Sequence, residues 1–236
     1  MSKSCVVFDF DGVIADTEAL HLQAYNATFA NMSAHIGGPL RISNEAYFGN
    51  YIVYGNHDGF LHMLQDHGRS YDEALLTSLC ALKDQLFNQG IGQFVQPLPG
   101  VREALGYLTS AQIPLAICSG ARREEIVHLL TVFQLAQHFP VIVAIEDVQK
   151  SKPDPEGYTR AFDLLNAQHG GTLNRAQSLA IEDSLGGITA ARTSGMQVLA
   201  VGTSLPLHKL RSQTPLVINS LQEVTLQQWN KWLALS

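Results

Sequence analysis

The chain has 236 residues, of which 46% are apolar, and it carries a formal net charge of −6. This length and apolar content suit one globular domain, or a domain that carries an insertion. Nucleic acid is disfavoured as a partner, because binding a phosphate backbone calls for clustered Lys and Arg, and only 15 are spread through this acidic chain.

The cysteines Cys5, Cys80 and Cys118 are odd in number and far apart in the sequence. They form no C-x-x-C pair, which argues against a disulfide framework and against a zinc site. The sequence has no run of about 18 apolar residues, and Asp9 and Asp11 interrupt the apolar stretch nearest its start. We therefore expect a cytoplasmic protein that neither crosses nor binds a membrane.

An apolar strand is predicted over residues 5–8, and Asp9, Asp11 and Gly12 follow it at once. Residues two apart in a strand point to the same face, so the two carboxylates would repel each other unless the backbone has begun to curl. A hard cation would relieve that repulsion and leave one carboxylate able to act as a nucleophile. Taken alone, the segment fits a strand end with a turn, or a calcium loop, equally well.

Three amphipathic helices are predicted next, with no strand between them. The first runs from residue 18 until the glycines at 37 and 38, the second over about 57–67, and the third over about 71–88, where leucines recur every three or four residues. This helical segment ends at residues 96–100, whose two prolines make a stiff stretch of the kind that re-enters a domain.

Short apolar runs alternate with helices in the rest of the chain. Strands are predicted over 114–118, 141–144, 178–181, 197–201 and 216–218, and helices over 100–112, 121–133, 155–168, 184–194 and from about 221. This alternation predicts an α/β fold with a Rossmann-like, doubly wound parallel sheet, which includes residues 5–8. The expected core is residues 1–16 plus 97–236, with an inserted α-helical domain over 17–96.

Polar residues stand where these strands end, which is where parallel sheets carry their active sites. Ser119 and Gly120 follow one strand and can present a hydroxyl and N–H groups to a phosphate. Lys152 stands in a loop stiffened by two prolines, and Glu182 and Asp183 follow a further strand. Helix capping by Ser119 or Asp183 and a surface position for Lys152 are the ordinary alternatives. Their arrival in order at the ends of different strands favours a common site.

The order D-x-D-G at 9–12, S-G at 119–120, K-P at 152–153 and E-D-S-L-G-G-I-T-A-A-R-T-S-G-M at 182–196 resembles the four motifs of the haloacid dehalogenase superfamily. The last segment is similar to that of its phosphoglucomutase-like and phosphoglycolate-phosphatase-like branch. The resemblance covers nearly the whole chain and is weakest over residues 36–70. It implies a phosphatase that acts on a small phosphorylated metabolite, with a helical cap domain over residues 17–96.

The resemblance also implies a role for each core residue. Asp9 would be the nucleophile that forms an aspartyl-phosphate, and Asp11 would be the general acid and base. Ser119, Gly120 and Lys152 would bind the phosphoryl group.

A Mg²⁺ site is the cofactor site that the resemblance implies. Asp9 and Asp183 would contribute side-chain oxygens, Asp11 its backbone carbonyl, and Glu182 would bind closely or through water. Oxygen ligands are what this hard dication prefers.

A β-phosphoglucomutase-like sugar-phosphate mutase is the alternative function. Such a mutase must hold a second phosphate, and between residues 18 and 97 the sequence offers only the cations Arg41, Arg69 and Lys83. We therefore favour hydrolysis. A dehalogenase would have no use for Asp11, and a binding protein without activity would have no reason to keep all four motifs.

Substrate contacts in the cap are expected from three residues. His21 resembles a histidine near the site of mutase-like members, although a solvated or capping histidine fits as well. Asn56 and His57 stand in a segment where relatives often carry an arginine, so we expect them to influence the choice of substrate. Phosphoglycolate, a hexose phosphate and a nucleoside monophosphate all fit these residues, and we expect the enzyme to be a monomer.

Overall fold

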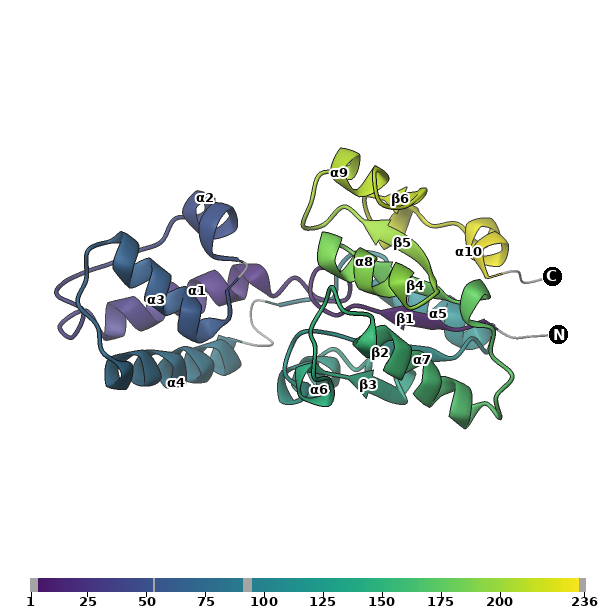
Figure 1. The fold of residues 1–236 in the computed structure, drawn as a ribbon, viewed down its shortest axis with the longest axis horizontal. Helices are drawn as coiled ribbons and strands as arrows, with labels where there is room; N and C mark the ends of the chain where they lie inside the picture. The colour runs from purple at the N-terminus through teal and green to yellow at the C-terminus, as the bar shows by residue number, and fades with distance from the viewer. Residues whose placement is uncertain (1–3, 53, 91–94, 234–236) are drawn as a thin grey trace. The chain divides into compact units, whose positions relative to one another are not determined.

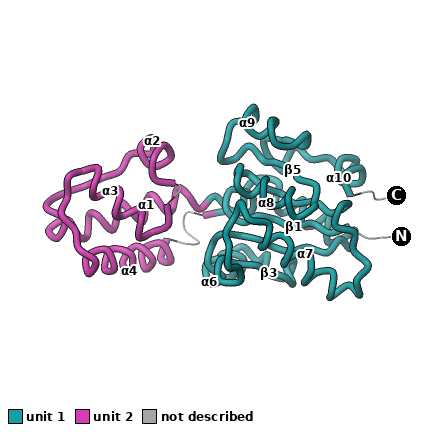
Figure 2. Tube along the Cα trace, viewed as in Figure 1, with its two compact units in different colours: residues 1–16, 96–236 teal, residues 17–95 magenta. Residues whose placement is uncertain are grey.

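The chain forms two compact units in the computed structural model, which describes residues 4–52, 54–90 and 95–233 (Figures 1 and 2). The sheet unit comprises residues 1–16 and 96–236, and the helical unit comprises residues 17–95. The helical unit is thus inserted into the sheet unit soon after its first strand. No helix among the described residues combines the length and the apolar character needed to cross a membrane.

The sheet unit is built on six parallel strands in the order β3-β2-β1-β4-β5-β6. The strands are β1 (Val6–Phe8), β2 (Leu115–Cys118), β3 (Val141–Val143), β4 (Leu179–Glu182), β5 (Gln197–Val201) and β6 (Leu216–Ile218). They are apolar almost throughout because both faces of the sheet are buried: Val7 belongs to the core under α7 (Glu156–Gln168), and Phe8 packs edge-on against Phe139. The predicted α/β fold is confirmed, and each strand lies within two residues of its predicted range.

Helices connect the strands as predicted, with two differences at the C-terminal end. The sheet unit contains α5 (Val101–Ser110), α6 (Arg123–Val132), α7, α8 (Leu185–Thr193), α9 (Leu207–Arg211) and α10 (Leu226–Trp232). The short helix α9 was not predicted. The last helix begins later than residue 221, because Thr225 caps it by accepting a hydrogen bond from the N–H of Gln228, and a 3-10 turn precedes it.

The strand order places β1 between β2 and β4. From β1 the chain adds β2 and β3 on one side of the sheet, then crosses through α7 and adds β4, β5 and β6 on the other side. Phe8 pairs with Ile117 on β2 and with Ile181 on β4, so the residues that follow these three positions emerge side by side. This is the switch point at which open α/β sheets place their ligands.

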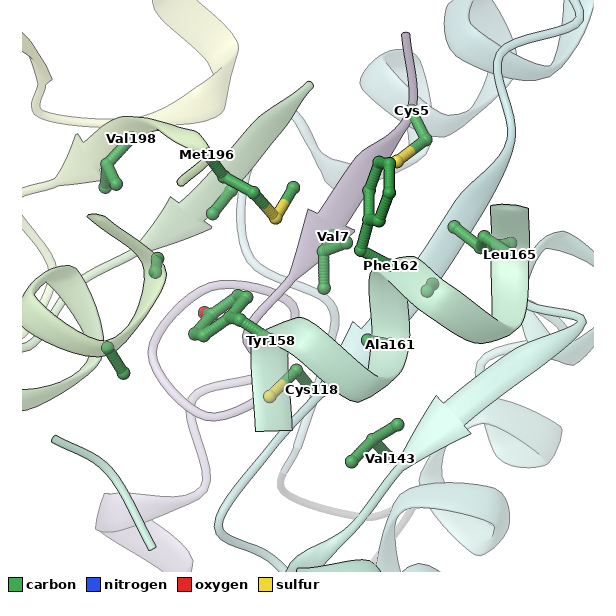
Figure 3. Close-up of a cluster of buried hydrophobic side chains, with 14 of the residues drawn as sticks. Cys5, Val7, Cys118, Val143, Tyr158, Ala161, Phe162, Leu165, Met196 and Val198 are labelled. Atoms are coloured by element: carbon green, nitrogen blue, oxygen red, sulfur yellow. The ribbon is translucent and has the colours of Figure 1, made fainter. Parts of the chain in front are cut away.

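One large apolar core lies between the sheet and the helices α7 and α8. Figure 3 shows part of this core, with Tyr158 at the start of α7. Its members include Val7, Ala116, Cys118, Val143, Tyr158, Phe162, Ile188 and Val198. Because the core reaches the carboxyl ends of β1 and β2, the polar residues that follow them stand on a rigid base.

The helical unit contains α1 (Glu18–Asn31), α3 (Asn56–Asp66) and α4 (Glu73–Gly90), and α1 packs against α4. The first helix ends before the predicted break at residue 37. Between α1 and α3 lie the short helix α2 (Asn44–Ala46) and a π-helical turn, Tyr47–Tyr51, which were not predicted. A π turn bonds residues five apart, as Ile52 N–H does to the Tyr47 carbonyl at 3.0 Å, and a 3.6-residue apolar period does not reveal it.

Candidate active site

The segment after β1 curls directly behind Asp9. Phe10 is buried, and its carbonyl accepts hydrogen bonds from the N–H groups of Ile14 at 2.8 Å and Ala15 at 3.1 Å. Gly12 adopts a φ of +74°, a conformation that favours glycine. Asp9 therefore remains buried at the strand end while the next residues turn, which is the curl that its spacing from Asp11 requires.

Gly12 also lies against Asp183, which follows β4. A Cβ atom on Gly12 would overlap the Asp183 carboxylate, so only glycine permits this approach. Asp183 is buried, and Ser204 donates a hydrogen bond to its Oδ2. The cap of the following helix is Ser184, whose Oγ accepts from the N–H of Gly187 at 3.0 Å. Helix capping therefore does not explain Asp183.

The Lys152 ammonium contacts residues at the ends of three neighbouring strands, β1, β2 and β4. Its Nζ lies 2.8 Å from Asp9 Oδ1 and 2.6 Å from Glu182 Oε1, and it donates to the Cys118 carbonyl at 3.0 Å. The loop before it is held in place by Glu156, whose carboxylate accepts two backbone N–H groups at 3.0 Å each. With 18% of its side chain exposed and two carboxylate partners, Lys152 is not a surface lysine.

Glu182 lies at the centre of a dense set of donors and is 0% exposed. Its Oε1 accepts from Lys152 and from the hydroxyl of Tyr158 at 2.8 Å. Its Oε2 accepts from the Asp183 N–H at 3.2 Å and from the N–H and Oγ of Ser184 at 3.3 and 3.0 Å. Tyr158 was not predicted as a site residue, because a tyrosine in an amphipathic helix is usually a core residue.

Three buried carboxylates lie close together at this edge. Asp9, Glu182 and Asp183 each offer an oxygen, and these oxygens lie within 4.8 Å of one another. Burial and the neighbouring Glu182 raise the pKa of Asp9 well above its usual range, and they raise the pKa of Asp183 to about 7. The charge of Asp11 also raises the pKa of Asp183. An oxygen donor set with excess negative charge suits a hard dication.

Ser119 directly follows the neighbouring strand β2 and is buried. Its N–H donates to the Val143 carbonyl at 2.9 Å, and its Oγ accepts from the Ala121 N–H at 3.0 Å. Gly120 is exposed, with open space where a Cβ would stand. The structure thus brings Ser119 to the sheet edge that carries Asp9, while phosphate binding by Ser119 and Gly120 stays a prediction.

His21 and Asn56 in the helical unit meet at a buried lysine. Lys83 is 1% exposed, and its Nζ lies 2.6 Å from His21 Nδ1 and 2.8 Å from Asn56 Oδ1. Asn56 donates in turn to Asp84 at 2.6 Å, and the His21 ring stacks on Phe87 with 4.2 Å between centroids. Burial and the Lys83 charge hold the pKa of His21 well below its usual range, so the neutral ring accepts from the ammonium.

Sequence reasoning recognised Lys83 as a cation of this segment and did not connect it with His21. A signal was present, since Lys83 falls on the helical stripe formed by Leu76, Leu79 and Phe87, which are all buried. A lysine at a core position requires buried partners. His57 behaves differently: it is exposed, and its ring nitrogens lie 3.2 Å from Asp58 Oδ1 and 3.1 Å from Glu73 Oε1.

A family model described as haloacid dehalogenase-like hydrolase matches residues 6–201. The chain belongs to this family. Phosphoglycolate phosphatase from Mesorhizobium japonicum is 28% identical to it, over 96% of this chain and 95% of that protein. Phosphorylated carbohydrates phosphatase from Thermotoga maritima is 27% identical, over 81% and 82%.

Among solved structures, β-phosphoglucomutase from Clostridium difficile matches this haloacid dehalogenase-like hydrolase with a TM-score of 0.73. The match covers 99% of this chain and 98% of that chain at 21% identity, and it shows a shared fold. The family resemblance inferred from the four sequence motifs is confirmed by these comparisons.

Proposed function

We propose that this hydrolase is a Mg²⁺-dependent phosphatase that acts on a small phosphorylated metabolite through an aspartyl-phosphate on Asp9. The observation that carries this proposal is the placement of the Lys152 ammonium between Asp9 and Glu182, beside Asp183. One fixed cation can orient a phosphoryl oxygen next to the nucleophile, and the carboxylates of Asp9 and Asp183 can hold a dication. The names of two relatives, both phosphatases, support the substrate class.

The proposed reaction has two steps on the same carboxylate. In the first, an oxygen of Asp9 bonds to phosphorus, the bond to the leaving oxygen breaks, and Asp11 gives that oxygen a proton. In the second, Asp11 takes a proton from a water molecule that attacks phosphorus, which releases phosphate and restores Asp9. Lys152 and the Ser119 hydroxyl hold the phosphoryl oxygens during both steps.

The side chains of Asp9 and Asp183 and the backbone carbonyl of Asp11 would hold Mg²⁺. The approach of Gly12 to the Asp183 carboxylate brings this backbone segment to the acidic cluster. A bound Mg²⁺ supplies positive charge that stabilises the charge developing on the phosphoryl oxygens.

Mg²⁺ is expected to raise the melting temperature more at about pH 8 than at about pH 5. Since the pKa of Asp183 is about 7 in the metal-free fold and about 4 in an unfolded chain, the native state holds the extra proton between these values. The free energy of unfolding without metal therefore falls as pH rises through that window, and Mg²⁺ competes best where the proton is gone. Thermal denaturation with EDTA or with excess Mg²⁺ measures the difference.

The control for this experiment is Asp183→Asn, which removes a charged ligand and keeps the size of the side chain. We expect this variant to lose most of the Mg²⁺-induced shift. Equal shifts at both pH values, or a full shift in the variant, would remove Asp183 from the metal site.

We propose that the helical unit is the cap domain that selects the substrate. Both of its connections leave the sheet unit at one place, a few residues after Asp9: Ala15 pairs with Pro97, and the Leu98 N–H donates to the Ile14 carbonyl at 2.9 Å. Paired connections of this kind can act as a hinge whose motion excludes water during turnover.

Hydrolysis is favoured over phosphoryl transfer by the cations of the helical unit. The Arg69 guanidinium donates to the carbonyls of Gly37 and Pro39, and Lys83 donates to Asn56. Two of the three cations are thus engaged inside the unit. A mutase needs charge-assisted contacts for a second phosphate, so water should be the acceptor here.

The test is a phosphate-release screen with Mg²⁺ over phosphoglycolate, hexose phosphates and nucleoside monophosphates. With a hexose 1-phosphate and catalytic hexose bisphosphate, we expect inorganic phosphate and little or no hexose 6-phosphate. Rapid formation of the 6-phosphate that depends on the bisphosphate and releases negligible free phosphate would show a mutase instead.

A further inference from the structure

We propose that Tyr158 is a positioning residue for Lys152: it acts through Glu182 and keeps this carboxylate paired with the lysine instead of a metal ion. The inference rests on the proposed function and assigns separate tasks to the two acidic residues that end β4. Glu182 would pair with Lys152, and Asp183 would bind the metal.

Tyr158 reaches the site because α7 begins very close to β2. A Cβ atom on the preceding Gly157 would lie 2.8 Å from the Cys118 Sγ, closer than real Cβ atoms approach, so a larger residue there would force Cys118 to shift. Tyr158 itself is 0% exposed and projects from the first turn of α7 into the core beside Cys118 (Figure 3). Its hydroxyl is therefore held at the buried base of the candidate active site.

The tyrosine contacts both members of the ion pair. Its hydroxyl donates to the same Glu182 oxygen that accepts from Lys152, at 2.8 and 2.6 Å, and the Lys152 Nζ lies 5.1 Å from the centre of the tyrosine ring. Because the Glu182 carboxylate is an acceptor, the tyrosine hydroxyl is the donor in this contact. The ring face adds a favourable cation–π contact with the ammonium.

Glu182 has no spare capacity for a direct metal bond. A carboxylate offers roughly four acceptor positions, and five donors already point at this one: two at Oε1 and three at Oε2. A Cβ on Gly187 would overlap the carboxylate, so the first turn of α8 packs directly on it and restricts its rotation. Binding a metal directly would displace at least one of these donors, and losing the partner of a buried donor such as the Tyr158 hydroxyl or the Asp183 N–H is costly.

Removing the tyrosine hydroxyl should therefore loosen Lys152 and leave the metal ligands in place. We expect Tyr158→Phe to raise the Kd for inorganic phosphate and the KM for p-nitrophenyl phosphate by about three- to tenfold, because one hydrogen bond to a buried charge is lost. The Kd for Mg²⁺ should stay within about twofold of its original value. Isothermal titration calorimetry measures the Kd for phosphate and the Kd for Mg²⁺ without turnover.

The matched control is Tyr107→Phe. Tyr107 donates its hydroxyl to Asn230 in the same unit, so the change removes the same group from a tyrosine outside the site. This control should alter neither constant. In a Glu182→Gln background, Tyr158→Phe should have little further effect on phosphate binding, since the tyrosine acts through the carboxylate that has been neutralised.

Unchanged phosphate binding in folded Tyr158→Phe would overturn the inference and leave the tyrosine a packing role. An equal loss of Mg²⁺ affinity would also overturn it, because Glu182 would then serve the metal. Should the phenylalanine variant not fold, 4-aminophenylalanine at position 158 keeps the ring and a donor and should bind phosphate like the original protein; a loss of binding in this variant contradicts the inference. If the unmodified protein with Mg²⁺ neither binds phosphate nor releases it from esters, the proposed function itself fails.

Discussion

Replacing Asp9 with asparagine should reduce the turnover of p-nitrophenyl phosphate by at least about a thousandfold, because an amide cannot become an acyl phosphate. The fold should survive. Burial and Glu182 raise the pKa of Asp9, so its charge is unfavourable in the metal-free protein, and Lys152 keeps Glu182 as a partner when that charge is removed. Phosphate release measures the loss of activity, and thermal denaturation confirms the fold.

The control for this variant is Asp16→Asn, which makes the same chemical change at an exposed position a few residues further on. It should retain activity. Substantial turnover by the Asp9 variant would show that another group is the nucleophile.

Lys152→Met should abolish detectable phosphatase activity. It should also lower the free energy of unfolding by about 3–5 kcal/mol near neutral pH, because it leaves two buried carboxylates without their counter-ion. Burial disfavours the ammonium, but Asp9 and Glu182 outweigh burial and raise its pKa, so in the natural protein the lysine stabilises the fold throughout the range below its ordinary pKa of about 10. In the variant the native state would retain a proton on Asp9, whose pKa burial raises. Its deficit in unfolding free energy should therefore shrink as pH falls.

Urea denaturation at about pH 8 and about pH 5 tests this dependence. Lys150→Met is the control, since Lys150 lies in the same loop with an exposed side chain and a weak 3.9 Å pairing with Asp154. It should change stability little. If Lys152→Met were as stable as the natural protein at the higher pH, Lys152 would not be the counter-ion of the two acids.

Much of the fold follows from local sequence. The strand at β1 is recognisable because an apolar run ends abruptly at Asp9, and the same holds where β4 ends at Glu182 and Asp183. Alternation of such runs with helices leaves few topologies other than a parallel sheet, and parallel strands carry their functional residues at one edge. The family could therefore be inferred from four short motifs before any contact was known.

Contacts between segments far apart in the chain needed the tertiary structure. Lys152 meets Asp9 and Glu182 only because α7 carries the chain across the sheet and places β4 beside β1. The same crossing brings Tyr158 beneath Glu182, although its sequence context is that of an ordinary core residue.

In the helical unit, too, the helices follow from local sequence, while the buried contacts depend on packing. The apolar period reveals its three main helices, yet the partners of Lys83 come from α1 and α3 and depend on how these helices pack against α4. Neighbouring positions can also differ sharply, since Asn56 contacts the buried Lys83 and the exposed His57 contacts Asp58 and Glu73. Periodicity and motifs are properties of consecutive residues, so the sequence by itself determined the elements, the family and the order of the polar strand ends. Which charges are buried together is set by packing between distant segments, and only the tertiary structure decided it, because the free energy of a buried charge depends on its partners in space.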